Sequence, residues 1–117
     1  MNEDSPADGL SRFAGQAAEA VSVLKLIAHE GRLLVLCYLS EAGEMSVGQL
    51  GERIGLSQSA LSQHLAKLRA QGLVATRKQA QTVYYRIDQP KVLTLLTVLH
   101  DLYCPALGVA DSKGARK

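Results

Sequence analysis

Hydrogen-bonding side chains gather in one short stretch near the middle of the chain. They are Gln58, Ser59, Ser62 and Gln63, with His64 and Lys67 soon after them. On a helix, small or hydrogen-bonding residues near the N-terminus can reach base edges in the major groove of DNA. The first four residues therefore predict base contacts, and His64 and Lys67 lie where phosphate contacts are expected.

Positive charge is concentrated around this stretch, although the net charge of the 117 residues is only +2. Residues 1–20 hold one basic and four acidic side chains, a balance of −3, whereas residues 53–91 hold seven basic side chains and one acidic side chain, a balance of +6. A basic region on a nearly neutral protein suits an anionic partner such as double-stranded DNA. A solvated basic face without a partner is the alternative that charge alone leaves open.

Two cysteines, Cys37 and Cys104, are the other residues with distinctive chemistry. In a reducing cytosol a permanent disulfide is not expected, and distant thiols often serve only as small buried apolar side chains. The chain has no phosphate-cradling glycine loop, no paired metal motif and no nucleophile with an obvious base nearby. The sequence thus predicts a binding protein that needs no cofactor and is not an enzyme, while the role of the thiols stays open.

The apolar spacing predicts two helices before the polar stretch. Residues 10–28 repeat apolar side chains every three or four positions, and residues 32–41 are almost wholly apolar, which implies burial on most sides. One domain at 10–104 is expected between a disordered lead-in at 1–9 and a flexible tail at 105–117. The acidic start, and the lack of an apolar run near the roughly 18 residues of a membrane span, predict a cytoplasmic protein without membrane contact.

Capping residues predict a helix-turn-helix around the polar stretch. Ser46 and Gln49 have the spacing of a capping box, and Gly55 can close the short helix that the box begins. Ser57 is placed to cap the next helix, predicted over 58–71. The buried stripe of that helix is Leu61, Leu65 and Leu68.

The apolar period changes to two after Gly72, which predicts a β-hairpin. The strand-like runs are 73–77 and 82–87, joined by a turn at 78–81 that lacks the Asn-Gly pair typical of tight hairpins. Such a hairpin is the natural wing of a DNA-binding domain. Its predicted tip offers three side chains to DNA, Arg77, Lys78 and Gln81.

The last predicted helix begins around Pro90 and ends at Cys104, because Pro105 disfavours helical geometry in the residue before it. The resulting order, α-α-α-α-β-β-α, is mainly α with a β-hairpin wing, which is the winged helix-turn-helix arrangement. A helical-hairpin domain that binds no nucleic acid is the alternative. The apolar side chains of the last helix predict either a dimer interface or a cap on the protomer core, and they are Val92, Leu95, Leu96, Leu99 and Leu102.

The strings LIAHEGRLLVLCYL and MSVGQLGERIGLSQSALSQHLAKLRAQGLVATRKQAQTVYYRI resemble the ArsR/SmtB family of winged-helix repressors, and the likeness covers residues 26–104. The resemblance implies a homodimer paired through its first and last helices. It also implies a palindromic operator, on which two recognition helices enter major grooves roughly 34 Å apart.

The chain departs from the metal-sensing members of that family. Ser46 and Gly48 stand where the third-helix metal motif of the family has two cysteines, and neither can act as a soft thiolate ligand. His100 and Asp101 lack the second ligand pair of the metal site in the last helix. No metal is therefore expected at either standard site.

The contexts of the two cysteines, LCYL around Cys37 and LYCP around Cys104, resemble the reactive-sulfur sensors of the BigR, SqrR, HlyU and YgaV type. In that type the matching cysteines form a disulfide or polysulfide bridge on meeting persulfides, and the repressor leaves DNA. The resemblance implies the same switch here. A metal or arsenical held by the pair, and inert core cysteines, stay open as alternatives. His100, four residues before Cys104 on the same helix face, could favour the Cys104 thiolate if protonated.

Overall fold

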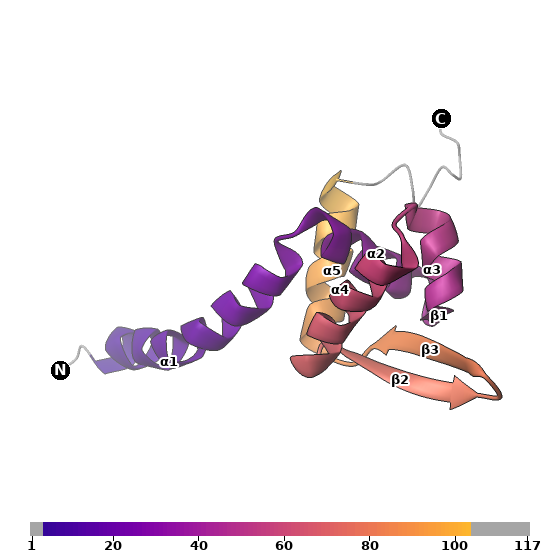
Figure 1. Ribbon diagram of the computed structural model, residues 1–117. Helices are drawn as coiled ribbons and strands as arrows, with labels where there is room; N and C mark the ends of the chain where they lie inside the picture. Colours follow the sequence, from indigo (N-terminus) through magenta and orange to yellow (C-terminus); the bar gives the residue numbers. More distant parts are fainter. Residues whose placement is uncertain (1–3, 104–117) are drawn as a thin grey trace.

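The computed structural model describes residues 4–103, with side chains from residue 9 onward, so that Cys104 and the predicted tail lie outside the described residues. The elements in chain order are α1 (Asp4–Ile27), α2 (Glu30–Ala42), β1 (Met45–Ser46), α3 (Val47–Ile54), α4 (Gln58–Ala70), β2 (Val74–Gln79), β3 (Thr82–Ile87) and α5 (Pro90–Tyr103) (Figure 1). This order confirms the predicted winged helix-turn-helix, with the two-residue strand β1 in addition.

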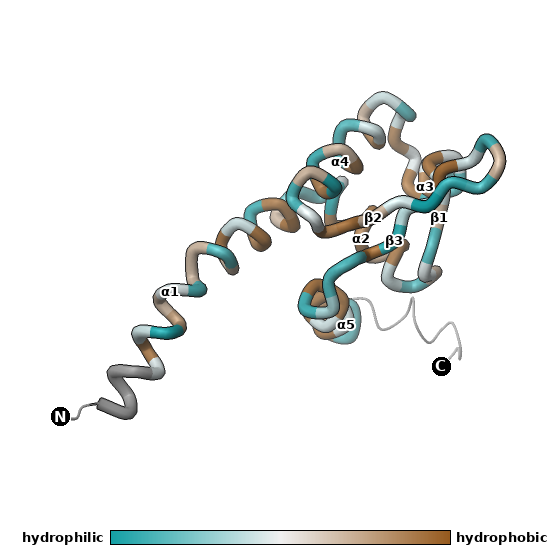
Figure 2. Tube along the Cα trace, turned by 90° about the horizontal axis from the view of Figure 1, so that it is seen from below, coloured by the Kyte–Doolittle hydropathy of each residue, from teal (hydrophilic) through white to brown (hydrophobic). Residues whose placement is uncertain are grey.

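Helix α1 begins at Asp4, six residues before the predicted start at Leu10. Residues 4–9 of the predicted lead-in therefore belong to α1 in this structure, while residues 1–3 lie outside the described part. Pro6 falls in the first turn, where its missing N–H is not needed. The helix projects away from the rest of the protein for much of its length (Figures 1 and 2).

Helix α2 forms the centre of the protein, since it packs against α1, α3, α4, α5 and β3. His29 caps it, and the His29 Nδ1 atom accepts a hydrogen bond from the Gly31 backbone N–H at 3.1 Å. The helix therefore starts at Glu30, two residues before the predicted Arg32. Its neighbours meet around it in a core whose fully buried side chains are Val35, Leu36, Leu39, Leu50, Leu61, Leu65, Leu68, Leu73, Val92 and Leu96.

The apolar stripe of α5 divides between the protomer core and the surface. Val92 and Leu96 are buried in the core, Leu95 and Leu99 are partly buried against it, and Leu102 is 66% exposed. Val92 and Leu96 therefore cap the protomer core, which is one of the two predictions made for this helix. Exposed large apolar side chains also lie on α1, where Phe13 is 65% exposed.

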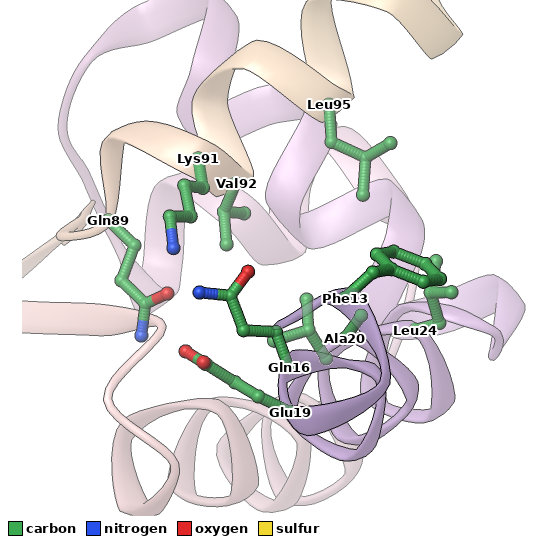
Figure 3. A pocket seen from close by; sticks show the side chains of 10 residues that line it. Phe13, Gln16, Glu19, Ala20, Leu24, Gln89, Lys91, Val92 and Leu95 are labelled. Atoms are coloured by element: carbon green, nitrogen blue, oxygen red, sulfur yellow. The ribbon is translucent and has the colours of Figure 1, made fainter. Parts of the chain in front are cut away.

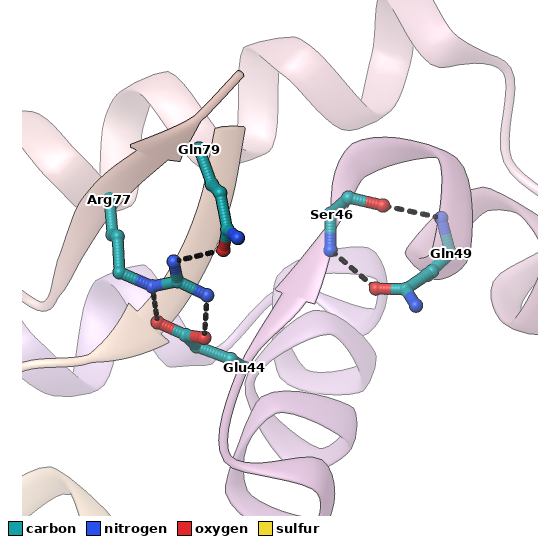
Figure 4. A network of polar contacts seen from close by, with 5 residues as sticks. All are labelled: Glu44, Ser46, Gln49, Arg77 and Gln79. Carbon is teal, nitrogen blue, oxygen red and sulfur yellow. Dashed lines mark hydrogen bonds and ion pairs between the residues drawn. The ribbon is translucent and has the colours of Figure 1, made fainter. Parts of the chain in front are cut away.

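The helix-turn-helix follows the predicted caps. Ser46 Oγ accepts a hydrogen bond from the Gln49 backbone N–H at 3.2 Å, and Gln49 Oε1 accepts one from the Ser46 backbone N–H at 2.9 Å (Figure 4). Gly55 closes α3 with a φ of 85°, a left-handed conformation that glycine adopts without strain. Ser57 Oγ then accepts a hydrogen bond from the Ala60 N–H at 3.1 Å and starts α4.

The wing is a three-stranded antiparallel sheet in the order β1-β3-β2. Strand β2 pairs with β3 from Val74↔Ile87 to Gln79↔Thr82, so the predicted four-residue turn at 78–81 is wrong. The turn consists of two residues, and Ala80 takes a φ of 56°. Tight two-residue turns need such a positive φ, and the paired strands on both sides impose it even without Asn-Gly.

Candidate DNA interface and thiol site

The exposed face of α4 carries the side chains that the sequence singled out for base contacts. The helix buries Leu61, Leu65 and Leu68 against the core, so the side chains between them face outward. Exposed side chains on this face are Gln58, Ser59, Ser62, Gln63 and Lys67. The surface that these residues form on α4 offers hydrogen-bonding groups and one positive charge, that of Lys67.

His64 differs from these neighbours because it packs against α2. Its ring lies 4.6 Å from the His29 ring, centroid to centroid, at an interplanar angle of 59°. A Cβ atom added at Gly31 would lie only 2.7 Å from His64 Nε2, which shows how closely the imidazole approaches the α2 backbone. Burial lowers the pKa of His64 below 6.5, and His29, Arg32 and Lys67 lower it further by charge repulsion. The side chain that the sequence assigns to a phosphate contact thus lies between α4 and α2 in this structure.

Arg77 is engaged inside the wing. Its Nε and NH2 atoms donate to the two carboxylate oxygens of Glu44 at 2.9 and 2.8 Å, and NH1 donates to Gln79 Oε1 at 2.7 Å (Figure 4). Its guanidinium carbon also lies 4.8 Å from the centre of the Tyr84 ring. The hydrogen bond from Arg77 lowers the pKa of Glu44. This clamp joins β2 to the loop before β1, and its acidic partner, 33 residues away, was not found from the sequence.

All three predicted wing residues are exposed, and Lys78 and Gln81 are the two that take no part in the contact with Glu44. Lys78 lies within β2, opposite Val83, and adjacent residues of a strand point to opposite faces. Its side chain therefore leaves the sheet on the other side from Arg77. Gln81 belongs to the two-residue turn at the tip.

Cys37 is half-buried on α2 and lines a cavity of about 290 Å³ between α2 and the last turn of α5. The other lining residues are Leu33, Leu99, His100 and Tyr103. Cys104 follows Tyr103 in the sequence but lies outside the described residues, so its separation from Cys37 is not defined. Within residues 4–103, no three His, Cys, Asp or Glu side chains are grouped to hold a metal ion.

A second hollow, of about 440 Å³, lies between α1 and the start of α5 (Figure 3). Phe13 and Leu24 line it from α1, and Val92 and Leu95 line it from α5. Gln16, Glu19, Gln89 and Lys91 add polar groups around these apolar side chains. The hollow is therefore lined by apolar side chains of both the first and the last helix.

Sequence comparison places these features in a known family. The family model described as "Bacterial regulatory protein, arsR family" matches residues 29–76, from the cap of α2 into β2. The transcriptional activator HlyU of Vibrio cholerae is 52% identical over 97 residues, which are 83% of this chain and 89% of HlyU. The chain is a member of the ArsR family. This ArsR-family protein is thus a DNA-binding transcriptional regulator and not an enzyme.

Solved structures agree with this assignment. Reduced HlyU from Vibrio cholerae matches with a TM-score of 0.76 at 52% identity, covering 80% of this chain and 97% of HlyU. The repressor BigR from Xylella fastidiosa matches with a TM-score of 0.75 at 36% identity, covering 80% of this chain and 95% of BigR. The regulator YgaV of Escherichia coli is 40% identical over 96 residues, 82% of this chain and 97% of YgaV. Across residues 4–103, no helix of this ArsR-family protein has the length and apolar character to cross a membrane.

Proposed function

We propose that this protein is a homodimeric repressor that binds a palindromic operator and leaves it when persulfide or polysulfide joins Cys37 to Cys104. The observation that carries the proposal is the position of Cys37. It lines a cavity whose opposite wall is the last turn of α5, and Cys104 is the next residue after that turn. A sulfur bridge between the two cysteines would then tie α2 to the end of α5.

In the DNA-bound state, α4 enters the major groove. Gln58, Ser59, Ser62 and Gln63 reach base edges with their hydrogen-bonding groups, and Lys67 lies one turn further on for a phosphate. Lys78 and Gln81 of the wing contact the adjacent backbone. Because phosphate contacts release counterions, binding should weaken steeply as salt is raised.

The dimer covers the apolar surface of α1 and α5. Large apolar side chains are exposed on both helices. They are Leu10, Phe13, Val21 and Leu24 on α1, and Leu93, Val98 and Leu102 on α5. Isolated apolar residues are common on protein surfaces, but seven large exposed apolar side chains on two helices that line one hollow support an interface. A two-fold axis through it would present two copies of α4 to successive major grooves, roughly 34 Å apart.

The switch is a thiol exchange in the reducing cytoplasm. A Cys37 persulfide, formed from an external hydropersulfide, is attacked by Cys104, which gives the disulfide and releases H₂S. If both cysteines carry a persulfide, the same reaction leaves one additional sulfur in the bridge. Helix α2 also packs against α4, so a bridge that moves α2 relative to α5 displaces the recognition helix. A coupling of about 1–3 kcal/mol would lower DNA affinity by about 5- to 150-fold.

The relatives support this proposal by their described roles. BigR is described as a transcriptional repressor, and a structure of HlyU is described as reduced, which distinguishes an oxidation state of that protein. HlyU is also described as a transcriptional activator. We assign repression here, since a protein that leaves DNA on oxidation regulates most simply by blocking transcription when reduced.

The test is DNA binding by fluorescence anisotropy on an operator selected from random sequence. Three reduced proteins are tested: the wild type, Cys37→Ser and Cys104→Ser. DNA binding by each is measured before and after addition of glutathione persulfide, hydrogen peroxide, arsenite or Zn²⁺. All three proteins should bind DNA when reduced, and persulfide should release only the wild type. The intact mass of the released protein should show the loss of two hydrogens, either alone for a disulfide or together with whole added sulfur atoms for a polysulfide bridge. Release of both serine variants by persulfide would overturn the proposal. Release by arsenite or Zn²⁺ alone would establish the metal-responsive alternative instead.

A further inference from the structure

A histidine and a carboxylate lie near Cys37 and take no part in the thiol exchange described above. His100 of α5 lines the same cavity as Cys37. Its Nε2 atom lies 3.5 Å from Oε2 of Glu41, which is on α2. Cys37 and Glu41 are four residues apart and therefore lie on one face of α2, the face that α5 covers.

The Nε2 atom of His100 is buried and has no hydrogen-bond partner within the described part of the chain. Buried polar atoms in proteins are almost always hydrogen-bonded, because desolvation without a partner is costly. The side chain is only 16% exposed, whereas that of Glu41 is 53% exposed and reaches the ring from the solvent side. An imidazole with an unpartnered nitrogen, at the edge of a cavity that also contains a thiol, is placed to take part in proton transfer.

This role in proton transfer follows from the two tautomers of a neutral imidazole. A proton on Nε2 would lie on the side of the Glu41 carboxylate, whose Oε2 atom is 3.5 Å away, and would leave Nδ1 as the acceptor, because only one ring nitrogen carries the proton in the neutral form. A carboxylate, an imidazole and a nucleophile in this order form the usual arrangement for activating a weak nucleophile.

We infer that His100 Nδ1 accepts the thiol proton of Cys37 and that Glu41 is the positioning residue that selects the tautomer of the ring. The inference rests on the thiol-sensing function proposed above and adds to it the order of events. Among the described residues, the ionisable groups beside the ring are Glu41 and Cys37 of α2 and Tyr103 of α5. We assign the attack to Cys37 because it lines the same cavity as His100, and Cys104 then resolves the product.

The first step transfers a sulfur atom from an external hydropersulfide to Cys37. The Cys37 thiolate attacks the outer sulfur of a hydropersulfide R–S–SH, and the bond between the two sulfur atoms breaks. The leaving thiolate RS⁻ takes the proton that His100 held, so the products are the Cys37 persulfide and RSH. The hydropersulfide is the oxidant, and His100 returns to its neutral form. Cys104 next forms the disulfide and releases H₂S.

The test measures the reactivity of Cys37 alone, in a Cys104→Ser background where no other thiol is present. Alkylation by iodoacetamide and persulfidation by glutathione persulfide are followed by intact mass across pH. His100→Gln should move both rate profiles toward the range of an ordinary thiol, about pH 8.5, and slow both reactions at neutral pH by about tenfold for each pH unit moved. Glu41→Gln should shift the profiles in the same direction by less. Added imidazole should restore part of the rate in His100→Ala.

Two matched variants control for the loss of an imidazole or a carboxylate elsewhere. His29→Asn keeps a good N-cap residue on α2, and Glu52→Gln alters an exposed carboxylate on α3; both should leave the profiles unchanged. Unchanged profiles in a folded His100→Gln variant, or no rescue of His100→Ala by imidazole, would overturn the inference. If Cys37→Ser still abolishes release from DNA, the proposed function survives that failure, whereas retained release in Cys37→Ser would refute the function itself.

Discussion

Replacing Gly31 by alanine should reveal how tightly the recognition helix is held against α2. Gly31 is buried in the first turn of α2, and its α-carbon faces the His64 ring. A new Cβ would lie 2.7 Å from His64 Nε2 and 3.1 Å from His64 Cδ2, both too close for atoms at rest. The imidazole must therefore move, and it would lose its contact with the His29 ring.

Two opposing terms set the size of the effect. Alanine is better than glycine in a helix by about 0.5–1 kcal/mol, whereas overpacking a close contact costs about 1–3 kcal/mol. Gly31→Ala should thus lower the free energy of unfolding by about 0–2.5 kcal/mol in the wild-type background. In a His64→Ala background the clash is absent, and the same change should raise stability by about 0.5–1 kcal/mol. The coupling energy between the two positions is then about 1–3 kcal/mol, as for residues in direct contact.

Urea unfolding followed by circular dichroism measures all four members of this cycle. Protein concentration must be the same throughout, because a dimer gains stability with concentration. Gly51→Ala is the matched control, since a Cβ there would meet its nearest neighbour at an ordinary 3.8 Å and should stabilise α3. If Gly31→Ala stabilises the wild type as much as it stabilises His64→Ala, then His64 does not pack against α2 as described.

Three further predictions concern the cap, the wing and the histidine. Ser46→Ala removes one half of the capping box and should lower the free energy of unfolding by about 0.5–2 kcal/mol in urea titrations. Lys78→Ala should reduce the slope of log affinity for DNA against log salt by about one, whereas Arg77→Ala should leave it unchanged because Glu44 already neutralises that guanidinium; equal losses would contradict this. The pKa of His64 is lowered on folding, so the unfolded chain binds more protons than the folded chain below about pH 6.5. The free energy of unfolding should therefore fall as pH is lowered through that value. His64→Gln should flatten this part of the stability profile, and an unchanged profile would mean that another group causes the fall.

The helix-turn-helix was predictable because its signals are local. The capping box at Ser46 and Gln49 involves residues three apart, and Gly55 needs only its own backbone to close α3. The leucine stripe of α4 follows from the helical period alone. Each of these features is stabilised by atoms within a few residues, so the chain carries the information next to where it is used.

The extra strand and the true shape of the wing were not predictable in the same way. Strand β1 has two residues, too few to show an alternating pattern, and exists because Met45 and Ser46 pair with β3 about 40 residues later. The tight turn at Ala80 lacks the usual residues and is imposed by the ladder on both sides. In both cases the stabilising hydrogen bonds come from segments far away in the chain.

For the candidate site, the sequence alone determined which helix follows the turn and which residue types it exposes, because caps and apolar period decide where a helix begins and which face it buries. The tertiary structure decided which of those side chains are available. His64 turns inward because Gly31 leaves room for its ring, and Arg77 is neutralised because Glu44 lies across the sheet from it. It likewise brought His100 and Glu41 beside Cys37. Such contacts depend on how helices and strands pack, and packing joins residues that no local pattern connects.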